Sequence, residues 1–483
     1  MKRETSALDA RLRRKVFGLS MSAALGGFLF GFDSSVVNGA VNAIQTQFEL
    51  PAVLTGFAVA SALFGCAVGA FAAGRLADRC GRITVMIVAA AIFVVSSIGS
   101  GLAFSVWDLV IWRAIGGLGI GIASVIAPAY IAEISPKAIR GRLASFQQLA
   151  ITLGIFAALL ADSQLAGMAG GASSPLWFGL EAWRWMFIVC AIPAVVYGVI
   201  AWKLPESPRY LLLKARPNDA REILALVLPK AELDVAIRTM EQNIAVDRAT
   251  SQSASLRGKT LGLAPVVWVG IVLSMFQQLV GINVIFYYST SLWSMVGFNE
   301  ANSFIISVLT SIVNVAVTFV AIGFVDRVGR RSLLLVGSAG MALSLGVMSL
   351  AFSQSAVVNG SPVLPLEWAI SALVAANVFV VAFGASWGPV VWVVLAEIFP
   401  NRIRAKALGL AGAVLWCMNF TVTVTFPVLA QGFSLAVAYG TYAFFALLSL
   451  IFVSVFVPET KGLALEGMTN LKFSGLWRST VHR

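Results

Sequence analysis

Long apolar stretches alternate with short polar ones along the whole chain. Twelve of the apolar stretches have about the 20 residues that a helix needs to cross a lipid bilayer. They cover residues 17–40, 52–74, 83–105, 107–132, 143–163, 185–203, 262–291, 301–323, 332–353, 368–398, 405–428 and 435–457. The pattern predicts an all-α membrane protein with twelve transmembrane helices.

A long polar segment, residues 204–260, separates the sixth apolar stretch from the seventh. It contains the run AREILALVLP, whose apolar spacing is typical of a short helix on a membrane surface. The segment divides the chain into an N-terminal six-helix half (17–203) and a C-terminal six-helix half (261–457). Polar tails, residues 1–16 and 458–483, flank the two halves.

Basic residues gather at alternate ends of the predicted spans. Apart from Arg113 and Arg184, every Lys and Arg lies in a tail, in the central segment or beside a loop that follows an even-numbered span. Because cytoplasmic loops collect Lys and Arg, we expect both termini and the central linker in the cytoplasm. The net charge of +12 then reflects topology and contact with anionic lipid headgroups, with no nucleic acid partner.

Composition supports a membrane protein and argues against an enzyme. Charged residues make up 12% of the chain, against about 25% in soluble proteins, and the mean hydropathy is +0.89. The four cysteines are far apart, and the one histidine, His482, is the penultimate residue. The sequence has no metal-ligand spacing, nucleotide-binding loop or nucleophile–base pair, so we expect no metal and no other cofactor.

Three motifs recur about 250 residues apart and in the same order. GRLADRCGRI (74–83) is echoed by GFVDRVGRRS (323–332), YIAEISPKAIRGRL (130–143) by VLAEIFPNRIRAKA (394–407), and PESPR by PETKG. A parallel repeat of this kind is typical of transporters built from two equivalent halves.

Asp33 and Arg113 are the only charges expected well inside the spans. Asp33 lies roughly 27 Å along a helix from Lys15, and Arg113 lies about 7 Å inward from Asp108, so both fall in the outer half of the bilayer. We expect them to pair, because a charge in hydrocarbon needs a partner or a function. Protonation of Asp33 would weaken the pair and favour a different packing of the helices, which is a route to proton coupling. A static ion pair is the alternative.

Several spans carry neutral amides beside aromatic residues. An amide both donates and accepts hydrogen bonds, as a hydroxyl does, so the set favours an uncharged polyol as substrate over simple bonding between helices. Trp392 follows Gly388 and Pro389, where a helix break is expected, and Trp416 shares a helical face with Asn419. The candidate substrate-binding residues are Gln148, Gln277, Gln278, Asn283, Asn314, Trp392, Trp416 and Asn419.

Small residues four positions apart predict close helix packing. Gly65 and Gly69 form one such pair in the second span, and Gly117 and Gly121 form another in the fourth. We expect these glycines to serve packing alone.

The motifs, together with QQLVGINVIFYYST (277–290), resemble the sugar porter family of the major facilitator superfamily, in particular its bacterial glucose and xylose proton symporters. The resemblance covers roughly residues 17–470. It implies two pseudo-symmetric six-helix halves and import of a monosaccharide, such as glucose, by proton symport through alternating access. It assigns sugar contacts to Gln148, Gln277, Gln278, Asn283, Asn314 and Trp392, and proton coupling to Asp33 and Arg113. It implies a conformational latch made of Asp78, Arg82, Glu133, Arg142, Asp326, Arg330, Glu397 and Arg404.

One position departs from the family pattern. Leu415 stands before Trp416, where related proteins commonly carry Gln or Asn, so the identity of the sugar stays open. A facilitative uniporter, or a symporter for xylose, fructose or myo-inositol, is the nearer alternative. A sugar receptor is less favoured, because the tails are short. We expect a monomer in a bacterial inner membrane, in contact with the lipid bilayer, a monosaccharide and a proton.

Overall fold

The computed structural model describes residues 2–135, 140–229, 232–253, 256, 258, 261–358, 361–400 and 403–460. Twelve helical segments in it are long and apolar enough to cross a membrane, so the predicted all-α fold with twelve spans is confirmed. These segments are α1, α2, α3, α4, α5, α6 with α7, α11 with α12, α14, α15, α16 with α17, α18 and α19.

The chain packs into two compact units. Unit 1 comprises Met1–Ser34, Ser61–Ala158 and Phe187–Ala254, and unit 2 comprises the remaining segments, Ser35–Ala60, Leu159–Met186 and Ser255–Arg483. Helices α1, α2, α5 and α6 (Ala182–Val189) contribute residues to both units. The units therefore divide the chain differently from the two six-helix halves, whose boundaries stay a prediction.

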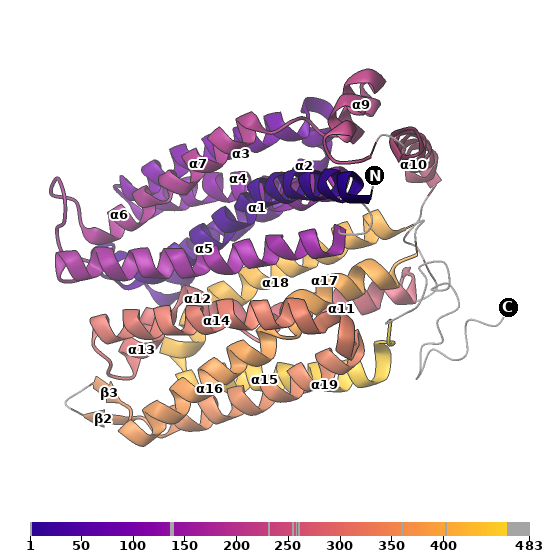
Figure 1. Ribbon diagram of the computed structural model, residues 1–483. Helices are drawn as coiled ribbons and strands as arrows, with labels where there is room; N and C mark the ends of the chain where they lie inside the picture. Colours follow the sequence, from indigo (N-terminus) through magenta and orange to yellow (C-terminus); the bar gives the residue numbers. More distant parts are fainter. Residues whose placement is uncertain are drawn as a thin grey trace. The chain divides into compact units, whose positions relative to one another are not determined.

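Unit 1 is built around α3, which packs against α4 and α7 (Figure 1). The part of the central segment that the structure describes contains three further helices, α8, α9 and α10. Helix α9 packs against both α8 and α10. The helices that form unit 1 or contribute to it are α1 (Lys2–Gln47), α2 (Ala52–Cys80), α3 (Arg82–Gly101), α4 (Val106–Ile134), α5 (Arg140–Ala169), α7 (Ala191–Lys203), α8 (Pro208–Leu213), α9 (Pro217–Ala225) and α10 (Leu233–Ser253).

Paired glycines bring α2 and α4 into backbone contact, as their spacing predicts. A Cβ on Gly65 would lie 2.0 Å from the Ala114 carbonyl oxygen, and one on Gly117 would lie 2.0 Å from the Ala62 carbonyl oxygen. Any larger residue at these positions would force the helices apart, since real Cβ atoms do not approach an oxygen so closely. The glycines thus fix the position of α4, which carries Arg113.

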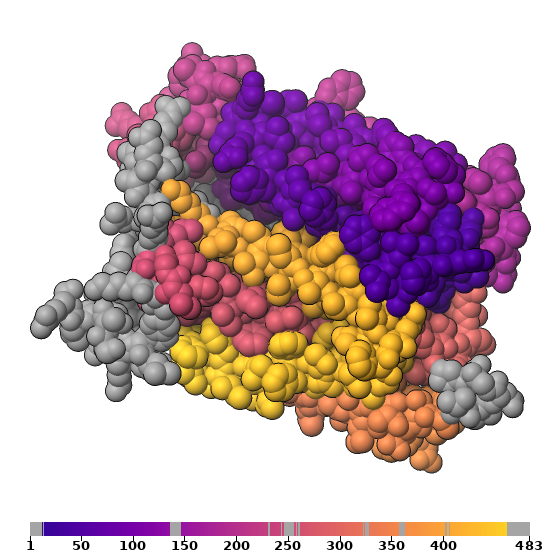
Figure 2. Space-filling model, turned by 180° about the vertical axis from the view of Figure 1, so that it is seen from behind, coloured from indigo at the N-terminus to yellow at the C-terminus, as the bar shows by residue number. Residues whose placement is uncertain are grey.

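Unit 2 contains two groups of packed helices. Helix α15 packs against α16 and α19, and α11 packs against α18; α18 and α19 lie side by side on the face shown in Figure 2. Its remaining elements are α6 (Ala182–Val189), which passes from unit 2 into unit 1, α11 (Pro265–Leu279), α12 (Ile282–Tyr287), α13 (Ser289–Met295), α14 (Glu300–Val328), α15 (Arg330–Ser353), the antiparallel strands β2 (Ala356–Val358) and β3 (Ser361–Val363), α16 (Leu366–Gly384), α17 (Trp387–Ile398), α18 (Arg404–Gly432) and α19 (Leu435–Phe456).

Large apolar side chains are exposed on both units. Phe71 is 74% exposed, Trp202 is 77% exposed and Leu343 is 73% exposed. Exposed apolar surface of this extent fits a protein whose solvent is lipid.

Candidate functional site

The predicted intramembrane ion pair is present in unit 1. Arg113 Nη1 donates to Asp33 Oδ1 at 2.5 Å, and Arg113 Nη2 donates to the Asp33 carbonyl oxygen at 3.5 Å. Asp33 is 6% exposed and Arg113 is 4% exposed. The guanidinium carbon also lies 5.3 Å from the centre of the Phe187 ring. Because both charges are buried, each depends on the other, and removing one leaves an uncompensated charge.

Small residues hold the segment of α1 that carries Asp33 close to α5. A Cβ on Gly31 would lie 2.0 Å from the Ile151 carbonyl oxygen, and one on Gly154 would lie 2.1 Å from the Phe28 carbonyl oxygen. The α1 backbone is therefore fixed two residues before Asp33, which limits where its carboxylate can reach.

A second carboxyl, Asp162, is buried inside a predicted span. Helix α5 continues to Ala169, beyond the expected end of the span at residue 163, so Asp162 lies within the helix and is 0% exposed. Its Oδ2 accepts a hydrogen bond from the Gly39 amide at 3.2 Å, while Oδ1 is buried without a partner in the part of the chain that the structure describes. The prediction that Asp33 and Arg113 are the only charges well inside the spans is therefore wrong.

Two helix breaks lie beside the predicted amides in unit 2. At the first, α11 ends at Leu279 and α12 begins at Ile282, because Gly281 adopts a left-handed conformation with φ of 78°. At the second, α16 ends at Gly384 and α17 begins at Trp387. The break expected near Gly388 and Pro389 thus occurs just before them, and Pro389 lies in the first turn of α17, where a residue without an N–H is tolerated.

The side chain of Gln277 reaches the second break. Its Nε2 donates to the carbonyl oxygens of Trp387 at 3.2 Å and Gly388 at 3.5 Å. Its Oε1 is buried and has no hydrogen-bond partner among the described residues. Gln277 therefore joins the end of α11 to the start of α17 and keeps an acceptor available.

Gln278 and Asn283 bond to each other across the first break. Asn283 Nδ2 donates to Gln278 Oε1 at 2.7 Å. The Gln278 Nε2 donor and the Asn283 Oδ1 acceptor are not used in this bond. Two neutral amides so arranged can offer one donor and one acceptor to a ligand.

The other candidate binding residues lie on separate helices. The Asn314 Oδ1 is 3.6 Å from where a Cβ of Gly384 would lie, so Asn314 borders the second break. Trp392, on α17, is 44% exposed. On α18, Asn419 is buried and accepts a bond from Thr423 Oγ1 at 3.3 Å, whereas Trp416 is half-buried. Gln148, on α5, is half-buried in unit 1, and Leu415 is buried.

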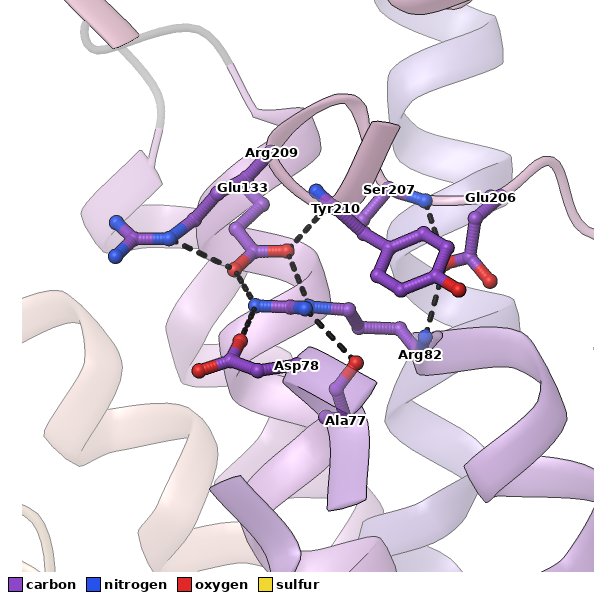
Figure 3. Close-up of polar contacts among 8 residues, drawn as sticks. All are labelled: Ala77, Asp78, Arg82, Glu133, Glu206, Ser207, Arg209 and Tyr210. Atoms are coloured by element: carbon purple, nitrogen blue, oxygen red, sulfur yellow. Dashed lines mark hydrogen bonds and ion pairs between the residues drawn. The ribbon is translucent and has the colours of Figure 1, made fainter. Parts of the chain in front are cut away.

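A charged cluster joins the α2–α3 junction to α4 and α8 in unit 1 (Figure 3). Arg82 Nε and Nη2 donate to the two oxygens of Glu133 at 3.0 Å and 2.9 Å, and Asp78 lies 2.9 Å from Arg82 Nη2. Ser207 Oγ also donates to Glu133 Oε2, and Arg209 Nε lies 3.8 Å from Glu133 Oε1. The Arg82 side chain is 6% exposed and that of Glu133 is 13% exposed. The bidentate pair is thus nearly shielded from solvent.

A related cluster lies in unit 2, with one guanidinium–carboxylate bond among the described residues in place of two. Arg330 Nη2 donates to Glu397 Oε1 at 3.2 Å, and Thr460 Oγ1 donates to Glu397 Oε2. Arg404 Nε donates to the Phe399 carbonyl oxygen at 3.1 Å, and partial burial lowers the pKa of its guanidinium. The side chains of Arg142 and Asp326, two other candidate latch residues, lie outside the described part of the chain.

Sequence reasoning did not assign the two glutamates that complete these clusters. Glu206 of PESPR accepts bonds from the Arg82 and Ile83 amides at 2.9 Å and 3.3 Å. Glu459 of PETKG accepts bonds from the Arg330 and Arg331 amides at 2.9 Å and 3.1 Å. Each carboxylate therefore binds the positive N-terminus of a helix, α3 or α15. The signal was the repeated Pro-Glu, whose partners lie more than 120 positions away in the chain.

These features define a class of protein. Twelve membrane-crossing helices, a buried acid–base pair and neutral amides at broken helices are typical of a secondary transporter. The broken helices matter because irregular backbone at membrane depth occurs where it lines a site or is buried in protein.

Comparisons with known proteins give the family. A family model described as "Sugar (and other) transporter" matches residues 19–471. A glucose transport protein of Synechocystis sp. is 52% identical over 453 residues, which are 93% of this chain and 96% of that protein. A D-xylose-proton symporter of Escherichia coli is 34% identical over 488 residues, with 94% and 95% covered.

Solved structures agree with this result. The proton:xylose symporter XylE bound to 6-bromo-6-deoxy-D-glucose is 34% identical, with a TM-score of 0.77 and coverage of 94% of this chain and 98% of that one. A partially occluded, inward open XylE from E. coli is 33% identical, with a TM-score of 0.80 and coverage of 93% and 100%. The chain belongs to the sugar transporter family, as the motifs indicated, and has the major facilitator fold. It is an integral, multi-pass membrane transporter and not an enzyme.

Proposed function

We propose that this protein imports a monosaccharide, a hexose such as glucose, together with a proton, by alternating access. The observation that carries the proposal is the Asp33–Arg113 pair, buried in an apolar unit and joined at 2.5 Å. The similarity to a glucose transport protein and to a D-xylose-proton symporter supports both the sugar and the proton.

The amides of unit 2 support an uncharged, hydroxyl-rich substrate. Gln277 offers an acceptor, and the bonded pair of Gln278 and Asn283 offers a donor and an acceptor. The exposed face of Trp392 suits the C–H face of a sugar ring. A neutral polyol can satisfy these groups without bringing an unpaired charge into the site. Gln148, Asn314, Trp416 and Asn419 complete the proposed binding set.

The ion pair supplies the coupling step. A proton from outside neutralises Asp33 and removes the charge that holds Arg113 at its present position. The two protonation states then favour different packings of the surrounding helices, because a protonated carboxyl no longer compensates the buried guanidinium. With sugar bound, the protein reorients, and the proton leaves Asp33 on the inner side. Arg113 then restores the ionised pair.

The charged clusters act as latches in this cycle. We infer that Asp78, Arg82 and Glu133 in one cluster, and Arg330 and Glu397 in its copy, stabilise the outward-facing state. Arg142, Asp326 and Arg404 join them on the same side by sequence position. Because each cluster fixes the junction between two spans, changing it alters which packing of the helices is favoured.

The distribution of basic residues supports a definite orientation. The termini and the central linker, which carry most of the Lys and Arg, lie in the cytoplasm of a bacterium, and the spans cross its inner membrane. The protein acts as a monomer, since one chain carries both the ion pair and the amides.

The direct test is uptake into vesicles that contain the purified protein. Labelled glucose should accumulate against its gradient when the outside is acidic, and an uncoupler should abolish accumulation. In a panel of unlabelled glucose, xylose, fructose and myo-inositol, glucose should compete most strongly. Uptake unaffected by the uncoupler would indicate a uniporter. Stronger competition by another sugar would identify that sugar as the substrate in place of glucose. Binding without uptake would indicate a receptor.

A further inference from the structure

Trp387, the first residue of α17, is tied to two other helices of unit 2. Its indole Nε1 donates to the Leu334 carbonyl oxygen at 3.1 Å and to Ser338 Oγ at 3.0 Å, both on α15. Ser449 Oγ, on α19, donates to Ser338 Oγ at 2.9 Å and to the Ala446 carbonyl oxygen at 2.7 Å. Trp387, Ser338 and Ser449 are all 0% exposed.

The Ser338 hydroxyl links the indole to α19, because it accepts from the Trp387 indole and from Ser449 Oγ. These bonds lie in an apolar core, where breaking one leaves a polar group unsatisfied, so they hold Trp387 in place.

The break before Trp387 is also packed tightly against α15. A Cβ on Gly337 would lie 1.8 Å from Ser386 Oγ, so the glycine is what allows Ser386 to approach. Ser386 Oγ in turn donates to the Ala382 carbonyl oxygen. The backbone of residues 386–388 is thus held by Gly337 on one side and by the indole of Trp387 on the other.

This fixed backbone determines how the Gln277 amide is turned. The carbonyl oxygens of Trp387 and Gly388 can only accept, so the Gln277 NH₂ must face them, and its Oε1 must point away. A free amide could turn and offer a ligand either a donor or an acceptor. Here the choice is removed, and Oε1 stays a buried acceptor that has no partner among the described residues.

We propose that Trp387, supported by Ser338 and Ser449, is a positioning residue that makes Gln277 an obligate acceptor, so that the site requires a sugar hydroxyl that donates at this point. The inference rests on the proposed function, since it concerns how a monosaccharide is selected. Selectivity at Gln277 then depends on the direction of the hydrogen bond between its amide and the sugar. Residues of α15 and α19 determine that direction by holding Trp387 in place.

Fluorinated sugars separate donation from acceptance. Replacing a hydroxyl with fluorine keeps the size and a weak acceptor but removes the donor. We expect one position of a deoxyfluoroglucose series to compete with labelled glucose about tenfold more weakly than glucose itself, which corresponds to about 1.4 kcal/mol, because the buried Gln277 acceptor is then left unsatisfied. That ratio of half-saturation constants is the readout.

The variants test whether Trp387 sets the ratio. In Trp387→Phe the indole N–H is lost, the backbone is released and the amide can turn, so the ratio should fall to about threefold or less. Ser338→Ala leaves the Leu334 carbonyl oxygen as an acceptor for the Trp387 indole, so this variant should lower the ratio only partly. The control Trp202→Phe, at a 77% exposed position of α7, should leave it unchanged.

Each outcome decides the proposal. If wild-type protein does not transport glucose or another hexose, the proposed function fails first and independently. If it transports hexose but no fluorinated position is discriminated, or if Trp387→Phe keeps the wild-type ratio, the positioning role is overturned. Should Trp387→Phe fail to fold, the ratio in Ser338→Ala decides: a lowered ratio supports the role, and an unchanged ratio overturns it.

Discussion

Replacing Glu133 with Gln should destabilise the protein through Arg82. Glu133 accepts two bonds from that guanidinium, at 3.0 Å and 2.9 Å, and the two side chains are only 13% and 6% exposed. Glu133→Gln keeps the shape and one acceptor oxygen but removes the negative charge. The Arg82 guanidinium would then be buried with Asp78 as its remaining carboxylate partner among the described residues.

The size of the effect follows from burial. Removing one member of a buried ion pair costs about 3–5 kcal/mol. Asp78 lies 2.9 Å away but is 60% exposed, so it recovers a small part, because exposed pairs contribute about 1 kcal/mol or less. A net loss of about 2–4 kcal/mol should lower the midpoint of thermal unfolding in detergent by roughly 2–4 °C, because the unfolding entropy of a chain of 483 residues is about 1 kcal/mol per kelvin.

The second copy of the cluster is the matched control. Glu397 accepts one guanidinium bond in the described part of the chain, from Arg330 at 3.2 Å, and its side chain is 22% exposed. Glu397→Gln should therefore lower the midpoint by less than half as much. Tryptophan fluorescence during heating measures both variants. Equal shifts, or no shift in Glu133→Gln, would refute the reasoning from burial and bond number.

Two further substitutions test local geometry. Gly81→Ala should lower the unfolding midpoint by about 1–3 °C, because Gly81 has φ of 97° and its new Cβ would lie 2.3 Å from Glu206 Oε2. The control Gly74→Ala, whose Cβ would have nothing within 4 Å, should leave the midpoint unchanged. Equal midpoints for the two variants would contradict the account. Asp162→Asn should keep or raise the unfolding midpoint and retain uphill uptake in vesicles. An amide oxygen can still accept the bond from the Gly39 amide at 3.2 Å, while the buried carboxyl is removed. Loss of uphill uptake would show that this carboxyl takes part in coupling.

The sequence indicates the ion pair because its members stand out. Asp33 and Arg113 interrupt apolar runs, and helix geometry alone puts them at matching depths, so their pairing needs no knowledge of the fold. Asp162 could not be found in this way. The residues around it, LADSQLAGMAGG, are small and partly polar, and they predict the end of a helix. Packing against Gly39 instead lets α5 continue and buries the carboxyl.

The charged clusters show a second limit. The repeats predict that Arg82 and Arg330 occupy equivalent positions, and both do bond to the glutamate of the second motif. The partners Glu206 and Glu459 depend on where distant segments return in the fold, which no local pattern specifies. The orientation of the Gln277 amide cannot be predicted from the sequence for the same reason, since it depends on two backbone carbonyls 110 and 111 positions away.

The most direct test of the central claim compares Asp33→Asn with Asp162→Asn in reconstituted vesicles. An amide in place of the Asp33 carboxyl cannot carry the proposed proton, so uphill accumulation of labelled glucose in an inward proton gradient should be abolished, whereas exchange of labelled for unlabelled glucose should continue. Asp162→Asn, which also removes a buried carboxyl, should keep both activities. Uphill accumulation by Asp33→Asn would contradict the account, because the proton would then be carried without this carboxylate.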